Sequence, residues 1–153
     1  MPPAPRTILI VEPDPDIRDL IALILRDAGY RATRAAGEAA ARAALAARRY
    51  DLVLLDTLGV ANVRDPGRWA AVGRVWAAAG GTPTMLATPY PPAAFADWRA
   101  RGFAGLIAKP FDCDDLLAAV AAALGGDTVC VGGGMRQAIT GRRSVPSRAQ
   151  RAR

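Results

Sequence analysis

The stretch Tyr50–Asp56, YDLVLLD, decides the fold of this chain. Its four consecutive apolar residues between two acids are too few for an independent helix. They are typical of a strand that is buried on both faces, as in a parallel sheet covered by helices. Such a strand delivers its last residue to the carboxyl edge of the sheet, where open α/β folds bind their ligands. The stretch therefore predicts that Asp56 lies in a binding site.

Three further apolar runs end in, or lead into, residues that can bind a ligand. The runs TILIV, TMLAT and LIA have the composition of buried strands, and they bring Glu12, Thr88 and Lys109 to their ends. Because the carboxyl ends of parallel strands meet at one edge of the sheet, we expect these side chains to lie near Asp56. The runs are residues 7–11, 84–88 and 106–108.

The residues at this edge favour a phosphoryl group or a metal ion as the ligand. Glu12, Asp14 and Asp56 would repel one another unless a divalent cation or Lys109 lies among them, and carboxylate oxygens suit Mg²⁺. Thr88 and Lys109 can both hydrogen-bond a phosphoryl group carried by Asp56. No Gly-rich loop follows the TILIV run, so the usual dinucleotide-binding fingerprint is absent.

The alternation of strands and helices predicts an α/β fold, a doubly wound parallel sheet of five strands with helices on both faces. Asp14 before Pro15 predicts a helix N-cap and a first helical residue, and Asp112 caps the last helix. The expected helices are residues 15–28, 38–48, 68–79, 92–101 and 114–124, and a shorter strand is expected at residues 30–33.

Length and composition indicate one domain. A chain of 153 residues can bury a sizeable core without disulfides or a structural metal. Two cysteines and no histidine exclude a disulfide framework, a Cys/His zinc cluster and a histidine-activated nucleophile. The predicted parts are a disordered lead-in at 1–6, the domain at 7–125 and a disordered Gly- and Arg-rich tail at 126–153. Residues 127–131 could instead add an edge strand.

Charge and hydropathy predict a soluble cytoplasmic protein without a signal peptide or a membrane segment. From Asp127 onward six arginines stand against one aspartate, a net charge of +5 out of the total of +6. The predicted domain is therefore nearly neutral. We favour a solvated tail over a nucleic-acid-binding arm, because the tail has low complexity and lacks aromatic residues.

Four fragments, in order, resemble the receiver domain of the two-component response-regulator family, the CheY-like superfamily. The fragments are ILIVE, DLVLLD, the segment from Pro83 through LAT, and KPF, and the intervals from Asp56 to Thr88 and from Thr88 to Lys109 closely match those of the family. The similarity spans residues 6–124. It implies a flavodoxin-like, five-stranded sheet with the strand order 2-1-3-4-5.

The resemblance implies that Asp56 is a phosphoacceptor in a phosphorelay. It would take a phosphoryl group from the phosphohistidine of a sensor histidine kinase or a phosphotransfer protein. Lys109 would bind the phosphoryl oxygens, and Thr88 would move towards them as the switch hydroxyl. Such a domain is a signalling module rather than a metabolic enzyme, although it can catalyse its own phosphorylation and dephosphorylation. Its output would pass to a downstream protein through a face built from residues 91–124.

By the same resemblance Mg²⁺ would be held by Glu12, Asp56 and the backbone carbonyl of Leu58. Asp14 is the less favoured ligand, because its helix-cap role already explains it. The family usually has an acidic metal ligand where this chain has Pro13, so we expect weak Mg²⁺ binding.

Further departures from the family keep a second function open. Pro89 follows the switch hydroxyl where the family has a small residue, and Leu106 replaces a common aromatic switch residue. These changes favour a pseudo-receiver, which would bind partners without being phosphorylated. A metal-dependent phosphatase on a similar fold is less favoured, because no cap domain or additional acid cluster is present.

Overall fold

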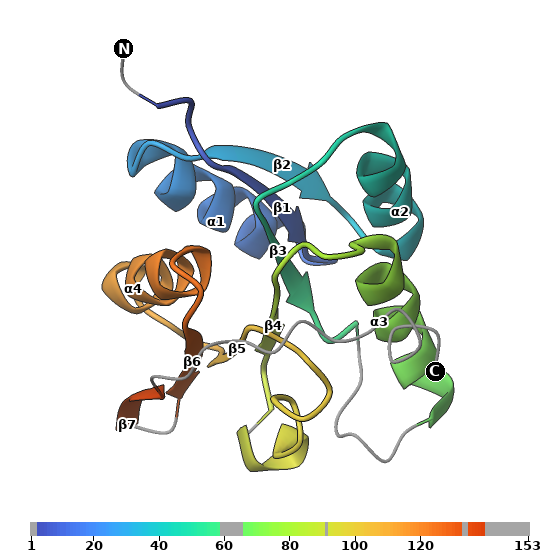
Figure 1. The fold of residues 1–153 in the computed structure, drawn as a ribbon, viewed down its shortest axis with the longest axis vertical. Coiled ribbons are helices and arrows are strands. Elements are labelled where there is room, and N and C mark those ends of the chain that lie inside the picture. Colours follow the sequence, from blue (N-terminus) through green and yellow to red (C-terminus); the bar gives the residue numbers. More distant parts are fainter. Residues whose placement is uncertain (1–2, 59–65, 91, 133–134, 140–153) are drawn as a thin grey trace.

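The computed structural model describes residues 3–58, 66–90, 92–132 and 135–139. Its strands are β1 (Thr7–Val11), β2 (Arg31–Ala35), β3 (Leu52–Asp56), β4 (Thr84–Thr88), β5 (Gly105–Ala108), β6 (Thr128–Gly132) and β7 (Met135–Ile139). They form one sheet in the order β2-β1-β3-β4-β5-β6-β7 (Figure 1). Strands β1 to β6 pair in parallel, and β7 is antiparallel to β6. The predicted order 2-1-3-4-5 is confirmed, and two strands extend it.

Helices cover both faces of this sheet. Among the described residues these are α1 (Pro15–Asp27), α2 (Glu38–Ala47), α3 (Pro66–Ala78) and α4 (Cys113–Leu124). Helices α1 and α4 lie on one face, and α2 and α3 lie on the other (Figure 1). In β1, Ile8 and Ile10 pack under α1 and α4, whereas Leu9 and Val11 pack under α2 and α3. Each such buried side chain stabilises the fold by about 1.5–3 kcal/mol.

The helix boundaries follow from the capping residues that the sequence supplies. Asp14 is the N-cap of α1 and accepts hydrogen bonds from the N–H groups of Asp16 and Ile17, with Pro15 as the first helical residue. Asp112 caps α4 by accepting from the N–H of Asp115 at 2.7 Å. None of the described helices has the length and apolar content needed to cross a bilayer.

The helix predicted for residues 92–101 is wrong beyond its first turn. Pro92–Phe95 form a single 3₁₀ turn, η1, and residues 96–102 continue as turns. Phe95, Trp98 and Phe103 are buried, and the N–H of Phe103 donates to the carbonyl of Trp98. Aromatic packing therefore holds a compact loop where a regular helix was expected.

The prediction of a disordered tail from residue 126 is wrong for its first part. β6 lies beside β5, and its Val129 is buried in the cluster under α1 and α4. The alternative edge strand at 127–131 corresponds to β6, but β7 was not predicted. Residues 1–2 of the lead-in and residues 140–153 of the tail lie outside the described residues. The lead-in is attached at its end, since the carbonyl of Arg6 accepts from the N–H of Arg31.

The pairing of β5 with β6 makes position 105 sensitive to the addition of a side chain. A Cβ atom there would lie 2.9 Å from the Val129 carbonyl oxygen and 3.0 Å from the Met85 side chain. We expect Gly105→Ala to lower the free energy of unfolding by about 1–3 kcal/mol, because the backbone of β6 must move. Chemical denaturation measures the change.

A matched control is Gly73→Ala in α3, where the added Cβ meets no atom within 4 Å. It should raise stability by about 0.5–1 kcal/mol, since Gly is a poor helix former. Equal stability of the Gly105→Ala and wild-type proteins would show that β6 does not pack against β5 as described.

Candidate functional site

Three strand ends bring two carboxylates and one ammonium together. Glu12 follows β1, Asp56 ends β3, and Lys109 follows β5. The Lys109 Nζ donates to Glu12 Oε2 at 2.6 Å and to Asp56 Oδ1 at 2.7 Å. These side chains are little exposed, at 12% for Lys109, 5% for Glu12 and 9% for Asp56. The structure thus brings together three of the predicted site residues, with Lys109 bridging the two acids.

Burial shapes the protonation of this cluster. It raises the pKa of the Glu12 carboxyl, and the nearby Asp56 charge adds to the rise, while the hydrogen bond from Lys109 opposes it only in part. For Lys109, burial alone would lower the pKa of the ammonium. The hydrogen bonds and charges of Asp56 and Glu12 together outweigh burial and raise that pKa. Lys109 is therefore a firmly charged cation at neutral pH.

The second oxygen of Asp56 is bound by the loop that follows β3. Asp56 Oδ2 accepts from the N–H of Leu58 at 2.6 Å. Leu58 has a positive φ of 53°, an uncommon conformation for a branched side chain. This turn positions the residue whose carbonyl was predicted to bind a metal. The strain of the turn is typical of functional loops.

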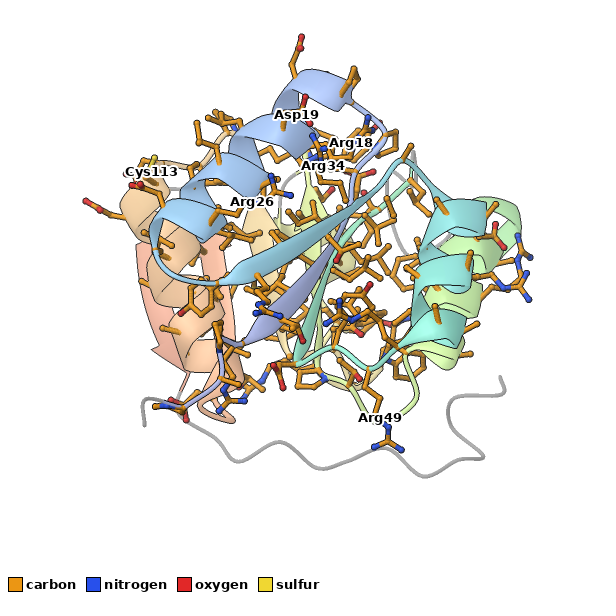
Figure 2. The ribbon with its side chains drawn as sticks, turned by 90° about the horizontal axis from the view of Figure 1, so that it is seen from above. Arg18, Asp19, Arg26, Arg34, Arg49 and Cys113 are labelled. Atoms are coloured by element: carbon orange, nitrogen blue, oxygen red, sulfur yellow. The ribbon has the colours of Figure 1, made fainter. Side chains whose placement is uncertain are left out.

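The loop after β1 uses the Asp14 carboxylate as a helix cap and two backbone carbonyls as acceptors for Arg18. The Asp14 carboxylate serves the N-terminus of α1, which agrees with the helix-cap interpretation of this residue. Arg18 Nη1 donates to the carbonyl of Glu12 at 2.9 Å and to that of Pro13 at 3.4 Å. Figure 2 shows Arg18 at the end of the sheet opposite to Arg49. The hydrogen bonds from Arg18 to this loop could not be predicted from the sequence, since a lone arginine in a helix carries no signal for them.

Thr88 has partners other than Asp56 and Lys109. Its Oγ1 accepts from Thr57 Oγ1 at 3.2 Å and from the N–H of Tyr90 at 3.2 Å. Both threonine side chains are fully buried. Only the backbone of Thr88 is linked to Lys109, whose N–H donates to the Thr88 carbonyl at 2.7 Å. Thr57 was not singled out in the sequence, although its place directly after Asp56 was the available signal.

The donor set fits a weak magnesium site. Within the described residues no group of three or more acidic or cysteine side chains is placed to hold a metal. Mg²⁺ keeps several waters, however, and needs only one or two carboxylates when a phosphoryl oxygen is also present. Glu12, Asp56 and the Leu58 carbonyl meet that minimum. Lys109 competes for both carboxylates and so weakens the site further.

Comparisons with known proteins agree with this geometry. The chain is 33% identical over 124 residues to Protein Rrf1 of Nitratidesulfovibrio vulgaris, covering 78% of this chain and 83% of that protein. The chemotaxis response regulator CheY4 of Vibrio cholerae has a TM-score of 0.63 at 25% identity, covering 78% of this chain and 98% of that one.

A second solved structure, a putative response regulator from Chloroflexus aurantiacus, has a TM-score of 0.64 at 27% identity. It covers 79% of this chain and 98% of its own. No protein-family model matches the sequence. The fold, the strand order and these relatives lead to one assignment: the chain belongs to the CheY-like response regulator receiver domains of two-component signalling.

Proposed function

We propose that this receiver accepts a phosphoryl group on Asp56 from a histidine kinase or a phosphotransfer protein. One observation carries the proposal: Asp56 ends β3, an interior strand of the sheet, with one oxygen 2.7 Å from the Lys109 ammonium. A cation at that distance can neutralise the charge of an incoming phosphoryl group. Positioning and charge neutralisation supply most of the catalysis of phosphoryl transfer.

In the proposed reaction an Asp56 oxygen attacks the phosphorus of a phosphohistidine. The new O–P bond forms as the N–P bond breaks, and the electron pair of that bond stays on the departing imidazole. Lys109 would exchange one of its carboxylate bonds for a phosphoryl oxygen, and the N–H of Leu58 would orient the acceptor carboxylate. Mg²⁺ held by Glu12, Asp56 and the Leu58 carbonyl would offset charge on the transferring group.

Incubation with acetyl phosphate and Mg²⁺, followed by intact mass measurement, tests the proposal. We expect the wild-type protein to gain one phosphoryl group, and the Asp56→Asn protein to gain none, because an amide is a poor nucleophile for this transfer. Asp16→Asn is the matched control, since Asp16 is an exposed carboxylate in the first turn of α1. It should be labelled like the wild type. Labelling of the Asp56→Asn protein would refute Asp56 as the acceptor.

A pseudo-receiver is the second candidate function. The observation that favours it is that Lys109 pairs with both acids, while Pro13 stands where the family usually has a metal ligand. A pseudo-receiver would stay unlabelled at every Mg²⁺ concentration. The wild-type and Asp56→Asn forms of a pseudo-receiver would nevertheless bind the partner protein with equal affinity.

The output partner would use a face built from η1 and α4, within the predicted 91–124 surface. β6 pairs along β5, so the edge of β5 cannot serve this contact. The partner would contact α4 and the η1 loop instead.

We further propose that the receiver comprises residues 7–139, with residues 140–153 as its tail.

A further inference from the structure

Thr57 and Thr88 are neighbours across the two central strands. Leu55 pairs with Leu86 in the parallel register of β3 and β4, and the N–H of Thr57 continues the ladder to the Ala87 carbonyl at 3.1 Å. Side chains alternate along a strand, so each threonine follows its leucine on the face covered by α2 and α3.

Asp56 belongs to the other row. It follows Leu52 and Leu54, which pack on the face covered by α1 and α4. The Thr88 hydroxyl therefore starts from the opposite face of the sheet to the carboxylate that it is expected to serve. To reach a phosphoryl group on Asp56, the side chain of Thr88 must turn about its χ1 angle.

That turn has to break existing hydrogen bonds. The Thr88 oxygen accepts from Thr57 Oγ1 and from the N–H of Tyr90, both at 3.2 Å. The side chains of Thr57 and Thr88 are 0% exposed, so water does not replace a lost partner there. A buried hydroxyl that loses its partner is penalised by its desolvation. The hydroxyl of Thr57 would bear this penalty whenever Thr88 turns away.

We propose that Thr57 is a positioning residue that holds the Thr88 hydroxyl away from Asp56, so that a phosphoryl group must compete with it for Thr88. The competition between Thr57 and a phosphoryl group rests on the proposed function of Asp56. The positioning of Thr88 by Thr57 in the free protein does not depend on that function. A valine has the shape of threonine without the hydroxyl. It would fill the same place under α2 and α3 and remove one of the two hydrogen bonds that hold the Thr88 oxygen, leaving the one from the N–H of Tyr90.

The first measurement uses the free protein. Three-bond couplings measured by NMR report the χ1 populations of Thr88. We expect one dominant rotamer in wild type, averaging over rotamers in Thr57→Val, and one rotamer again in Thr57→Ser, which restores the hydroxyl. Thr84→Val is the matched control, because Thr84 is a buried threonine at the other end of β4 whose hydroxyl bonds the Thr82 carbonyl. An unchanged single rotamer in Thr57→Val would overturn the proposal.

The second measurement is the affinity for beryllofluoride, a phosphoryl mimic, in the presence of Mg²⁺. Thr57→Val should bind it about three- to tenfold more tightly, the effect of one neutral hydrogen bond. Thr57→Ser and Thr84→Val should match the wild type. A merely structural role of Thr57 would change unfolding without this gain, so denaturation of each variant is recorded in parallel. Equal affinity in all four proteins would overturn the competition while leaving Asp56 as acceptor.

If none of the four proteins binds beryllofluoride, the proposed function of Asp56 fails and the competition fails with it. The coupling measurement then decides by itself whether Thr57 holds Thr88. The two failures are thus distinguishable, because the rotamer of Thr88 is measured without any phosphoryl mimic.

Discussion

The Lys109→Met protein should be about 3 kcal/mol less stable than the wild type at neutral pH, because removing one partner leaves buried charges unpaired. Lys109 is the cation within 2.7 Å of both Glu12 and Asp56, whose side chains are 5% and 9% exposed. The expected loss of stability lies at the lower end of the range for broken buried ion pairs, since the cluster lies at the edge of the sheet. Chemical denaturation measures the difference.

The loss should depend on pH in a defined direction. Burial already raises the pKa of Glu12 above its ordinary value of 4.5, and losing the Lys109 hydrogen bond raises it further. The folded variant then binds that proton more tightly than the unfolded chain does. The Lys109→Met protein therefore keeps its stability at pH values below the ordinary pKa of Glu12. It loses stability as the pH rises through the raised pKa of that group. The stability difference from wild type should therefore narrow as the pH falls from neutrality towards the ordinary pKa of 4.5.

Two further variants control this experiment. Arg34→Met removes an exposed cation that pairs with Asp19, and such pairs contribute about 1 kcal/mol at most. Adding Glu12→Gln to Lys109→Met should restore part of the lost stability, because one buried charge is gone. A loss as small as that of Arg34→Met would mean that the cluster is well solvated.

The Pro13→Asp protein should need at least about tenfold less Mg²⁺ than wild type for half-maximal phosphorylation of Asp56. One carboxylate near a divalent ion contributes more than about 1.4 kcal/mol even with strong screening. Pro13 lies between Glu12 and the Asp14 cap, at the position where the family usually supplies a direct ligand. Labelling by acetyl phosphate over a Mg²⁺ titration, read by intact mass, gives the concentration required.

Pro15→Asp is the matched control, with the same chemical change two residues away on the first turn of α1. It should leave the Mg²⁺ requirement unchanged. If Pro13→Asp is labelled while the wild type stays unlabelled even at high Mg²⁺, the chain is a pseudo-receiver. An equal requirement in both proteins would show that position 13 does not face the metal.

The strands and the acidic cluster could be predicted because each rests on a short-range signal. An apolar run such as Leu52–Leu55 can only be buried, and the polar residue after it must then lie at the sheet edge. Three such ends supply Glu12, Asp56 and Lys109, and opposite charges brought to one edge pair with each other. Capping residues likewise act within one helical turn.

What could not be predicted depends on contacts between distant segments. Residues 96–102 form turns because Phe95 and Phe103 pack against Trp69 from α3, which no local pattern encodes. β6 forms because β5 offers an open edge, although the flanking glycines favour a linker. The bond from Thr57 to Thr88 needs the register of β3 against β4, which is known only once the sheet is built.

The two-sided pairing of β5 has a mechanical consequence for Lys109. A strand at the border of a sheet can slide or fray by breaking one ladder of hydrogen bonds. β5 would have to break two, since β4 and β6 hold it from either side, and Gly105 leaves no slack between Met85 and Val129. The backbone of Lys109 is thus attached to a strand that resists displacement. When the charge on Asp56 changes, the ammonium can follow only by bending its own four-carbon stem.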